Sequence, residues 1–295
     1  MKGKVSSYLI GNQQVRVYIA ETTELVKHAM AVHGTSPLST AALGRVLTAA
    51  TILGRMTKSD NEQVTLQISG TNQIKSIVAI TDASGNVKGY ISNSLAELPL
   101  NPQGKLDVGG AVGKDGKLVL IRDMGLKEPY VGHANLITGE IAEDLAAYFM
   151  YSEQQPTAVS LGVLTDAEVF VRAAGGMVIQ TLPNVDEEVI EKLETAINGM
   201  APISNMIDQG MTPDAIIDTV FTDFDSELLE VVDIEYTCNC SEERMLKGLI
   251  SIGEKDLREI IEEDGKVELH CHFCNTYYNF TRSQIEDILD AALKA

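Results

Sequence analysis

In the first 182 residues, stretches with the two-residue hydrophobic period of a strand are interspersed with stretches that have the period of a helix. Residues 5–20 alternate hydrophobic and polar positions around a Gly11-Asn12 pair, which predicts two short strands joined by a turn. The two-residue period of a strand returns at residues 63–69, 74–81, 87–92, 117–122, 158–164, 169–173 and 177–182. Helices are predicted at residues 22–34, 38–56 and 139–150, and the second, apolar nearly all round, is expected in the domain centre. The mixture predicts an α+β fold whose N-terminal mixed α/β domain, residues 1–182, contains a largely antiparallel sheet.

Residues 183–235 keep a helical period but differ sharply in charge. They hold fourteen Asp or Glu residues and one basic residue, Lys192, so the segment carries a net charge of −13. Hydrophobic residues recur at helical spacing from Val189 to Val232, and Pro202 and Pro213 divide the segment into short helices. Short helices are stable only when their apolar faces dock, and dense like charge opposes a compact segment. We therefore predict an acidic amphipathic helical linker close to its folding threshold, while an ordered connecting subdomain without a switching role fits the same composition.

Residues 236–295 predict a small C-terminal domain. Helices are expected at residues 241–247 and 254–263, and the capping-box pattern from Thr281 to Gln284 opens a final helix that runs to Leu293. The alternation at residues 266–270 and 275–280 is typical of two strands joined by a tight turn. A domain of about sixty residues has a small core and commonly needs a further stabilising element.

All four cysteines fall in this last domain. Cys238 and Cys240 form a C-x-C pair, and after thirty intervening residues Cys271 and Cys274 lie in a C-x-x-C pair. Two short pairs that the fold brings together supply four thiolates to one point, which is the ligand set of a closed tetrahedral zinc site. We therefore predict one Zn²⁺ per chain in the reduced state. The neighbouring His270 and His272 are better explained as solvent-facing strand residues than as ligands.

The single residue between Cys238 and Cys240 is uncommon in a zinc ribbon and raises a second possibility. Two thiols so close can pair once a metal no longer holds them, and a small strained ring is typical of a labile, regulatory disulfide. A permanent zinc staple fits the same spacing, so spacing alone leaves both possibilities open. Zinc contributes about 10 kcal/mol or more to the folding of small zinc-dependent peptides, so losing it would unfold a domain of this size.

Composition and motifs exclude several functional classes. The net charge of −19 opposes non-specific binding to nucleic acid. No hydrophobic run approaches membrane-spanning length and residues 1–14 do not resemble a secretion signal, so reduced, metal-bound cysteines indicate the cytoplasm. The Gly109–Gly116 stretch lacks the Lys-Ser/Thr ending of a phosphate loop and predicts turns. His28, His33 and His133 have no partner at catalytic spacing, so we expect no enzymatic activity.

Several segments outside the cysteine pairs carry further specific patterns. They are Tyr130-Val131-Gly132, residues 139–146, residues 151–158, Ala174-Gly175-Gly176 and residues 180–183. Together with the C-x-C and C-x-x-C pairs, these segments lie between residues 130 and 274. On these residues the chain resembles the Hsp33 family of redox-regulated molecular chaperones.

The resemblance implies an ATP-independent holdase that oxidation switches on. The reduced, zinc-bound form would be a poor chaperone, and peroxide with heat, or hypochlorous acid, would form the disulfides Cys238–Cys240 and Cys271–Cys274 and release the zinc. The linker would then lose order and expose apolar surface that holds unfolded or oxidatively damaged client proteins. The active form in the family is a homodimer, and after reduction its clients pass to ATP-dependent chaperones.

Two alternatives from other classes fit part of the pattern. A C-x-x-C pair also occurs in thiol-disulfide oxidoreductases, but here it lies outside a thioredoxin-like strand–helix context. A static zinc-ribbon protein that binds nucleic acid would need a basic surface, which the net charge of −19 disfavours.

Overall fold

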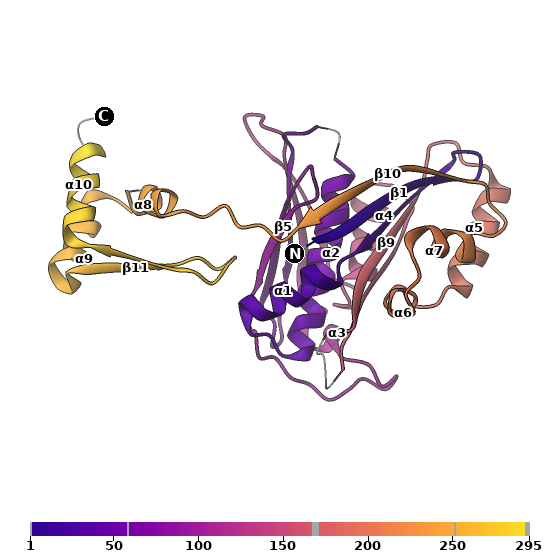
Figure 1. Cartoon of the computed structure of the whole chain (residues 1–295), viewed down its shortest axis with the longest axis horizontal. Coiled ribbons are helices and arrows are strands. Elements are labelled where there is room, and N and C mark those ends of the chain that lie inside the picture. Colours follow the sequence, from indigo (N-terminus) through magenta and orange to yellow (C-terminus); the bar gives the residue numbers. More distant parts are fainter. Residues whose placement is uncertain (1, 58, 167–170, 251, 293–295) are drawn as a thin grey trace. The chain divides into compact units, whose positions relative to one another are not determined.

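The computed structural model describes residues 2–57, 59–166, 171–250 and 252–292. The chain separates into two compact units, Met1–Thr237 and Cys238–Ala295 (Figure 1). All four cysteines therefore belong to the second, smaller unit. None of the helices in the described ranges is long and apolar enough to cross a membrane.

The first unit contains a five-stranded sheet whose three central strands are largely buried on both faces. Its strands are all antiparallel and follow the order β10 (Ser226–Glu235), β1 (Lys2–Ile10), β2 (Val15–Glu21), β9 (Ala173–Thr181) and β8 (Thr157–Leu164). Along β9, Val178 packs into one hydrophobic cluster while Met177 and Ile179 pack into the other. Because successive strand residues point to opposite faces, a strand covered on both sides needs a continuous hydrophobic run, as β9 has.

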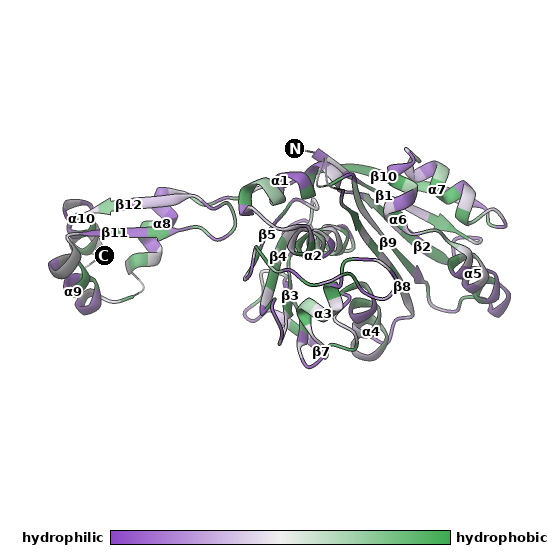
Figure 2. Ribbon diagram, turned by 90° about the horizontal axis from the view of Figure 1, so that it is seen from below, coloured by the Kyte–Doolittle hydropathy of each residue, from purple (hydrophilic) through white to green (hydrophobic). Residues whose placement is uncertain are grey.

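A second antiparallel sheet faces the first across a central helix. Its order is β5 (Val87–Ile91), β4 (Ser76–Asp82), β3 (Gln63–Ser69), β6 (Lys117–Asp123) and β7 (Tyr130–Asn135). Helix α2 (Pro37–Arg55) lies between the two sheets (Figure 2), beside α1 (Thr23–His33). Gly44 of α2 leaves no room for a side chain between Val26 and Val163, so this small residue permits the close packing expected of the helix. The remaining helices before the acidic segment are α3 (Val108–Val112) and α4 (Ala142–Ser152).

The acidic segment covers the outer face of the first sheet. It forms the short helices α5 (Glu187–Gly199), α6 (Ile203–Asp208) and α7 (Pro213–Val220), and then enters β10 beside β1 (Figure 1). Pro213 begins α7, and the Thr212 side chain caps it by accepting a hydrogen bond from Ala215 N. The prolines thus divide the segment into separate helices as predicted.

The second unit has its own small core. It consists of α8 (Glu242–Ile250), α9 (Glu254–Asp264), the hairpin β11 (Lys266–His270) and β12 (Tyr277–Thr281), and α10 (Arg282–Ala292). Six buried side chains form its described core: Leu249, Leu257, Val267, Phe280, Ile285 and Leu289. Ser241 accepts a hydrogen bond from Arg244 N at the start of α8, and the Gln284 side chain accepts one from Thr281 N. Both predicted helix starts therefore have a polar cap.

The α+β fold with antiparallel sheets is confirmed, and three local predictions need correction. Residues 226–235 form strand β10 and not a helix, because their hydrophobic residues also fit a two-residue period and the edge of β1 offers a pairing partner. The predicted strands 169–173 and 177–182 become the single strand β9 from Ala173, with residues 169 and 170 outside the described ranges. Part of the glycine-rich stretch 109–116 is helical, as α3. Leu293, the predicted end of the last helix, also lies outside the described residues.

Candidate metal centre

Two short segments of the second unit carry the four cysteines. Cys238 and Cys240 lie directly before α8, and Cys271 and Cys274 lie in the turn between β11 and β12. Cys271 N donates a hydrogen bond to Thr276 O at 2.9 Å, and Asn275 N donates one to Cys271 O at 2.8 Å. Asn275 has a left-handed φ of 58°, a conformation that asparagine tolerates better than most residues. The C-x-x-C pair is therefore held in one tight turn, as the strand pattern predicted.

The fold brings all four predicted sulfur atoms together. Their Sγ atoms lie within 4.8 Å of one another, and none of the four cysteines forms a disulfide. The Sγ–Sγ distance is 3.7 Å between Cys238 and Cys271 and 3.2 Å between Cys240 and Cys274. Each of these two contacts joins the C-x-C segment to the C-x-x-C turn, although the two segments are about thirty residues apart in the sequence.

The sulfur spacing fits a tetrahedral metal site. Zinc bonded to four thiolates at about 2.3 Å places neighbouring sulfur atoms about 3.8 Å apart. The 3.7 Å contact matches this edge length, and the 3.2 Å contact requires an outward shift of only a few tenths of an ångström on each side. Cys271 is buried and the other three cysteines are partly exposed. Four cysteines arranged in this way can hold a metal ion.

Two hydroxyl groups contact the sulfur cluster. The Tyr278 hydroxyl donates a hydrogen bond to Cys240 Sγ at 3.1 Å, and Thr276 Oγ1 lies 3.2 Å from Cys274 Sγ. This hydrogen bond to Cys240, together with burial, raises the pKa of Tyr278 to about 12. Both residues come from the return side of the hairpin, so the turn supplies two cysteines and two hydroxyl groups.

The thiol groups differ in acidity. Burial raises the pKa of the Cys238 and Cys240 thiols above the usual value. Burial also acts to raise the pKa of Cys274, but its hydrogen-bonding contacts with Thr276 and Cys240 outweigh burial and lower that pKa to about 7.

The histidines beside Cys271 do not join the cluster of ligand atoms. His270 Nε2 hydrogen bonds to Asn275 Oδ1 at 2.5 Å, and the His270 ring stacks on Tyr277 with ring centroids 4.4 Å apart. His272 is exposed and meets His270 edge to face. Both rings lie outside the cluster of four sulfur atoms, but only His270 is a strand residue, and it is partly buried; His272 lies in the turn and not in a strand as predicted.

The first unit contains a second feature of interest, an apolar sheet face covered by the acidic segment. The sheet side of this cluster consists of Tyr8, Ile10, Val15, Val17, Ile19, Met177 and Ile179. The acidic segment contributes Leu193, Ile203, Met206, Ile216, Ile217 and Phe221. Ile207 packs directly against Gly175 of β9, where no side chain fits. We call the seven sheet residues the covered sheet face.

This chain is similar to proteins of one family over nearly its whole length. The model of the family described as Hsp33 protein matches residues 3–281. The chain is 45% identical over 290 residues to the 33 kDa chaperonin of Alkaliphilus metalliredigens, covering 98% of this chain and 99% of that protein. It is 46% identical over 288 residues to the 33 kDa chaperonin of Alkaliphilus oremlandii, covering 98% and 96%. The crystal structure of the 33 kDa chaperonin of Thermotoga maritima, a heat shock protein 33 homologue, is similar with a TM-score of 0.89 at 35% identity over 99% of each chain.

The chain belongs to the Hsp33 family. Hsp33 proteins are chaperones and not enzymes, which confirms the expectation of a non-enzymatic protein and disfavours a thiol-disulfide oxidoreductase. The family assignment also confirms the resemblance carried by the cysteine spacing and the segments between residues 130 and 183.

Polar contacts attach the acidic segment of this Hsp33 protein to the rest of the first unit. The Tyr8 hydroxyl donates a hydrogen bond to Asp214 Oδ1 of α7 at 2.8 Å. Arg172 forms a two-pronged contact with Asp208 at the end of α6, with N–O distances of 3.1 and 2.5 Å. Arg55 of α2 binds both carboxylate oxygens of Glu230 in β10, at 2.9 and 3.0 Å. Because these ion pairs are partly exposed, each contributes about 1 kcal/mol or less, and most of the attachment is apolar.

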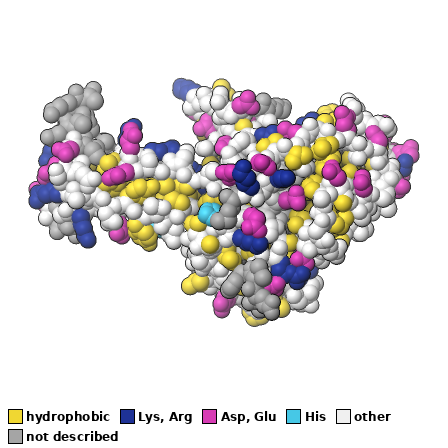
Figure 3. Space-filling model, in the orientation of Figure 1, with side chains coloured by type: hydrophobic (Ala, Val, Ile, Leu, Met, Phe, Trp, Pro, Cys, Tyr) yellow, Lys and Arg dark blue, Asp and Glu magenta, His cyan; other side chains and the backbone are white. Residues whose placement is uncertain are grey.

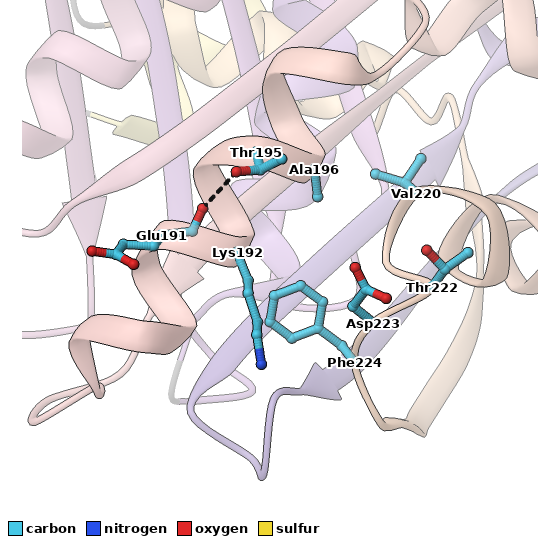
Figure 4. Close-up of a pocket in the computed structure, with 8 residues that line it drawn as sticks. All are labelled: Glu191, Lys192, Thr195, Ala196, Val220, Thr222, Asp223 and Phe224. Carbon is cyan, nitrogen blue, oxygen red and sulfur yellow. Dashed lines mark hydrogen bonds between the residues drawn. The ribbon is translucent and has the colours of Figure 1, made fainter.

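Helix α5 is the least buried of the three covering helices. All thirteen of its residues are described, and only Leu193 is buried. A cleft of about 310 Å³ opens between α5 and the residues that follow α7. Figure 4 shows the Lys192 side chain running beside the ring of Phe224, with Asp223 on the opposite wall. The acidic segment is thus incompletely packed within itself.

On the face seen in Figure 3, acidic side chains lie among hydrophobic ones where Figure 1 places α5, α7 and β10.

Sequence reasoning found the four cysteines but not the residues around them. Tyr278, Thr276, Tyr8 and Arg172 were not recognised, because each acts through a partner that no short motif places beside it. Tyr8 and Asp214, for example, are 206 residues apart in the sequence.

Proposed function

We propose that this chain is a redox-regulated, ATP-independent holdase chaperone that is inactive when reduced and active when oxidised. The observation that carries the proposal is the convergence of four cysteine sulfurs within 4.8 Å in a chain of the Hsp33 family. In functional terms the chain would have three parts: a core at residues 1–182, an acidic linker at residues 183–235 and a zinc and redox-switch domain at residues 236–295.

In the reduced state, Cys238, Cys240, Cys271 and Cys274 would hold one zinc ion as thiolates. Bound zinc would tie the C-x-C segment to the hairpin turn and so stabilise a unit whose described core is only six side chains. Oxidation would form the disulfides Cys238–Cys240 and Cys271–Cys274, the pairing that the family resemblance implies. Forming each disulfide removes two electrons from a pair of thiolates, and one hydrogen peroxide accepts these electrons with two protons from solvent to give two waters. The cysteines of an oxidised pair are no longer metal ligands.

The linker would then lose its order. Its net charge of −13 opposes compaction, α5 buries a single side chain, and a cleft separates α5 from the end of α7. Lifting α5, α6 and α7 would uncover the covered sheet face together with their own apolar side chains. Unfolded or oxidatively damaged client proteins would bind this surface, and the linker methionines Met200, Met206 and Met211 suit varied client sequences.

The remaining features of the proposal follow from the family resemblance. The active form would be a homodimer in the cytoplasm, and reduction would hand clients to ATP-dependent chaperones. Neither nucleic acid nor membrane is expected as a partner, since the chain carries a net charge of −19 and none of the described helices is suited to span a membrane.

One sample of reduced, zinc-loaded protein tests the proposal. Peroxide is added at raised temperature, and zinc release, free thiols, protease resistance of residues 183–235 and suppression of client aggregation are followed together. We expect the four signals to change in parallel, while untreated protein stays inactive. Loss of zinc and thiols without any gain in aggregation suppression would contradict the proposal, as would a linker whose protease resistance survives zinc removal.

A further inference from the structure

Two hydroxyl groups of the hairpin are placed to control the reactivity of the cysteine cluster. Tyr278 lies on β12, and its hydroxyl donates a hydrogen bond to Cys240 Sγ at 3.1 Å. Thr276 precedes β12 by one residue, and the Cys274 thiol donates a hydrogen bond to its Oγ1 at 3.2 Å. When Cys274 is a thiolate it carries no proton, so the Thr276 hydroxyl becomes the donor in this contact. Cys240 and Cys274 are themselves in contact, at 3.2 Å. The two hydroxyl groups therefore contact the same side of the cluster, one on a cysteine of each pair.

The remaining two cysteines have a different environment. Within the described residues, no side-chain hydroxyl is in hydrogen-bonding contact with Cys238 Sγ or Cys271 Sγ. Cys271 is protected by burial, with 5% of its surface exposed, whereas Cys240 and Cys274 are partly exposed. The hydroxyl contacts thus fall on two of the three partly exposed cysteines.

We propose that Tyr278 and Thr276 are positioning residues that slow oxidation of Cys240 and Cys274 and tighten metal binding in the reduced state. The inference rests on the proposed redox switch and deepens it. A hydroxyl that donates to a metal-bound thiolate engages a sulfur lone pair, so the sulfur becomes a weaker nucleophile towards peroxide. The same hydrogen bond fixes the direction in which the sulfur points, which favours the metal-bound geometry.

The contact also favours the reduced state over the oxidised state. A thiolate accepts a strong, charge-assisted hydrogen bond, whereas a disulfide sulfur is a weak acceptor. Forming a disulfide at Cys240 or Cys274 therefore loses most of the hydrogen bond. The Tyr278 ring itself packs against the core of the second unit, so its hydroxyl position is set by the fold.

The test compares variants that lose the hydroxyl group while the rest of the side chain keeps its shape. Tyr278→Phe keeps the ring in the core, and Tyr277→Phe is its matched control because Tyr277 is exposed and contacts His270 through its ring. Thr276→Val keeps the shape of the side chain, and Thr276→Ser, which retains the hydroxyl, should restore wild-type behaviour. All proteins are full length, reduced and zinc-loaded.

Two measurements are made on each protein. Zinc affinity is determined by competition with a chromophoric chelator, and removal of an outer-shell hydrogen bond is expected to lower it by about 10-fold or more. Alkylation by iodoacetamide is mapped to each cysteine by mass spectrometry. The thiolate displaces iodide to form a thioether, and Tyr278→Phe should accelerate this reaction at Cys240 several-fold relative to Cys271 in the same sample.

The outcomes separate this inference from the proposed function. The inference alone would be overturned if Tyr278→Phe matched wild type within about twofold in zinc affinity and in Cys240 alkylation, and Thr276→Val did so in zinc affinity and in Cys274 alkylation. A variant that lost zinc but alkylated all four cysteines equally faster would indicate general loosening and would also overturn it. If wild-type protein binds zinc but gains no holdase activity on oxidation, the proposed switch is overturned. The role of the two hydroxyl groups is then still decided by the zinc affinities and alkylation rates of the variants. Wild-type protein that retains no zinc would overturn both.

Discussion

Truncation of one buried side chain should release the acidic linker without any oxidation. Phe221 follows α7, is 2% exposed and meets Phe224 edge to face with ring centroids 6.1 Å apart. It packs in the cluster that joins the linker to the covered sheet face. Replacing a buried Phe by Ala costs about 3–5 kcal/mol. Since this side chain becomes exposed whenever the linker lifts, the cost falls on the docking equilibrium, and even about 3 kcal/mol raises the undocked population more than 100-fold.

Hydrogen exchange on the reduced, zinc-loaded Phe221→Ala variant measures this release directly. Amides of α5, α6 and α7 should exchange faster by about the same factor of 100, while those of β4 in the second sheet stay protected. Aggregation suppression should appear in the reduced protein, because linker release no longer depends on the cysteines. Phe149→Ala is the matched control: Phe149 is equally buried but belongs to the cluster around α2, so it should lower global stability and leave the linker docked.

Two results would refute this reasoning. Linker amides that keep wild-type protection in Phe221→Ala would mean that the docking of residues 183–225 does not depend on this cluster. A linker that is released as strongly by Phe149→Ala as by Phe221→Ala would mean that the segment follows global stability and is no separate unit.

Three further outcomes follow from individual contacts. Cys238→Ser should weaken zinc retention in the reduced protein, and unchanged zinc content at stoichiometric metal would contradict the ligand assignment. Tyr8→Phe removes the hydrogen bond to Asp214 and should raise amide exchange in α7 about fivefold, equivalent to about 1 kcal/mol; unchanged exchange would show that the contact does not hold the linker. Because burial raises the pKa of Cys238 and Cys240, these thiols are protonated near neutral pH and zinc must displace the protons. Zinc affinity should therefore rise between about pH 6 and about pH 8, and a pH-independent affinity would be inconsistent with this.

The sequence predicted the parts of the fold that depend on local pattern. Helix α2 was found because its small and apolar residues surround it on all sides, and the structure places it between two sheets. The hairpin around Cys271 and Cys274 was found because turn and strand patterns agree there. Where two patterns fitted equally, the prediction was wrong: β10 contains hydrophobic residues at both helical and strand spacing, and its partner β1 lies more than 200 residues away.

In the candidate site, too, some residues could be predicted from local sequence patterns and others depend on tertiary structure. Cysteine spacing alone identified four residues that converge, because few other functions require two such short pairs in one chain. The hydroxyl of Tyr278 and the linker contacts of Tyr8 and Arg172 depend on tertiary structure, and nothing in their own neighbourhood distinguishes them from other polar residues. Patterns therefore located the cysteine cluster, and geometry was needed to find the hydroxyl groups that contact it and the sheet face that the acidic segment covers.

The chain itself limits how a change at the cysteines can reach the linker. Tyr236, two residues before Cys238, is buried, and its hydroxyl donates to Gly89 O at 2.8 Å, while Thr237 N donates to Val87 O at 2.9 Å. Strand β10 then pairs with β1 from Glu235 to Ser226 before α7 is reached. This stretch is held by backbone pairing along all of β10, interrupted by one register shift between Ser7 and Tyr8, whereas α5 has one buried side chain and a cleft along it. Loss of order is therefore expected to begin in the helices that cover the sheet, with β10 the last part of the acidic segment to separate from the first unit.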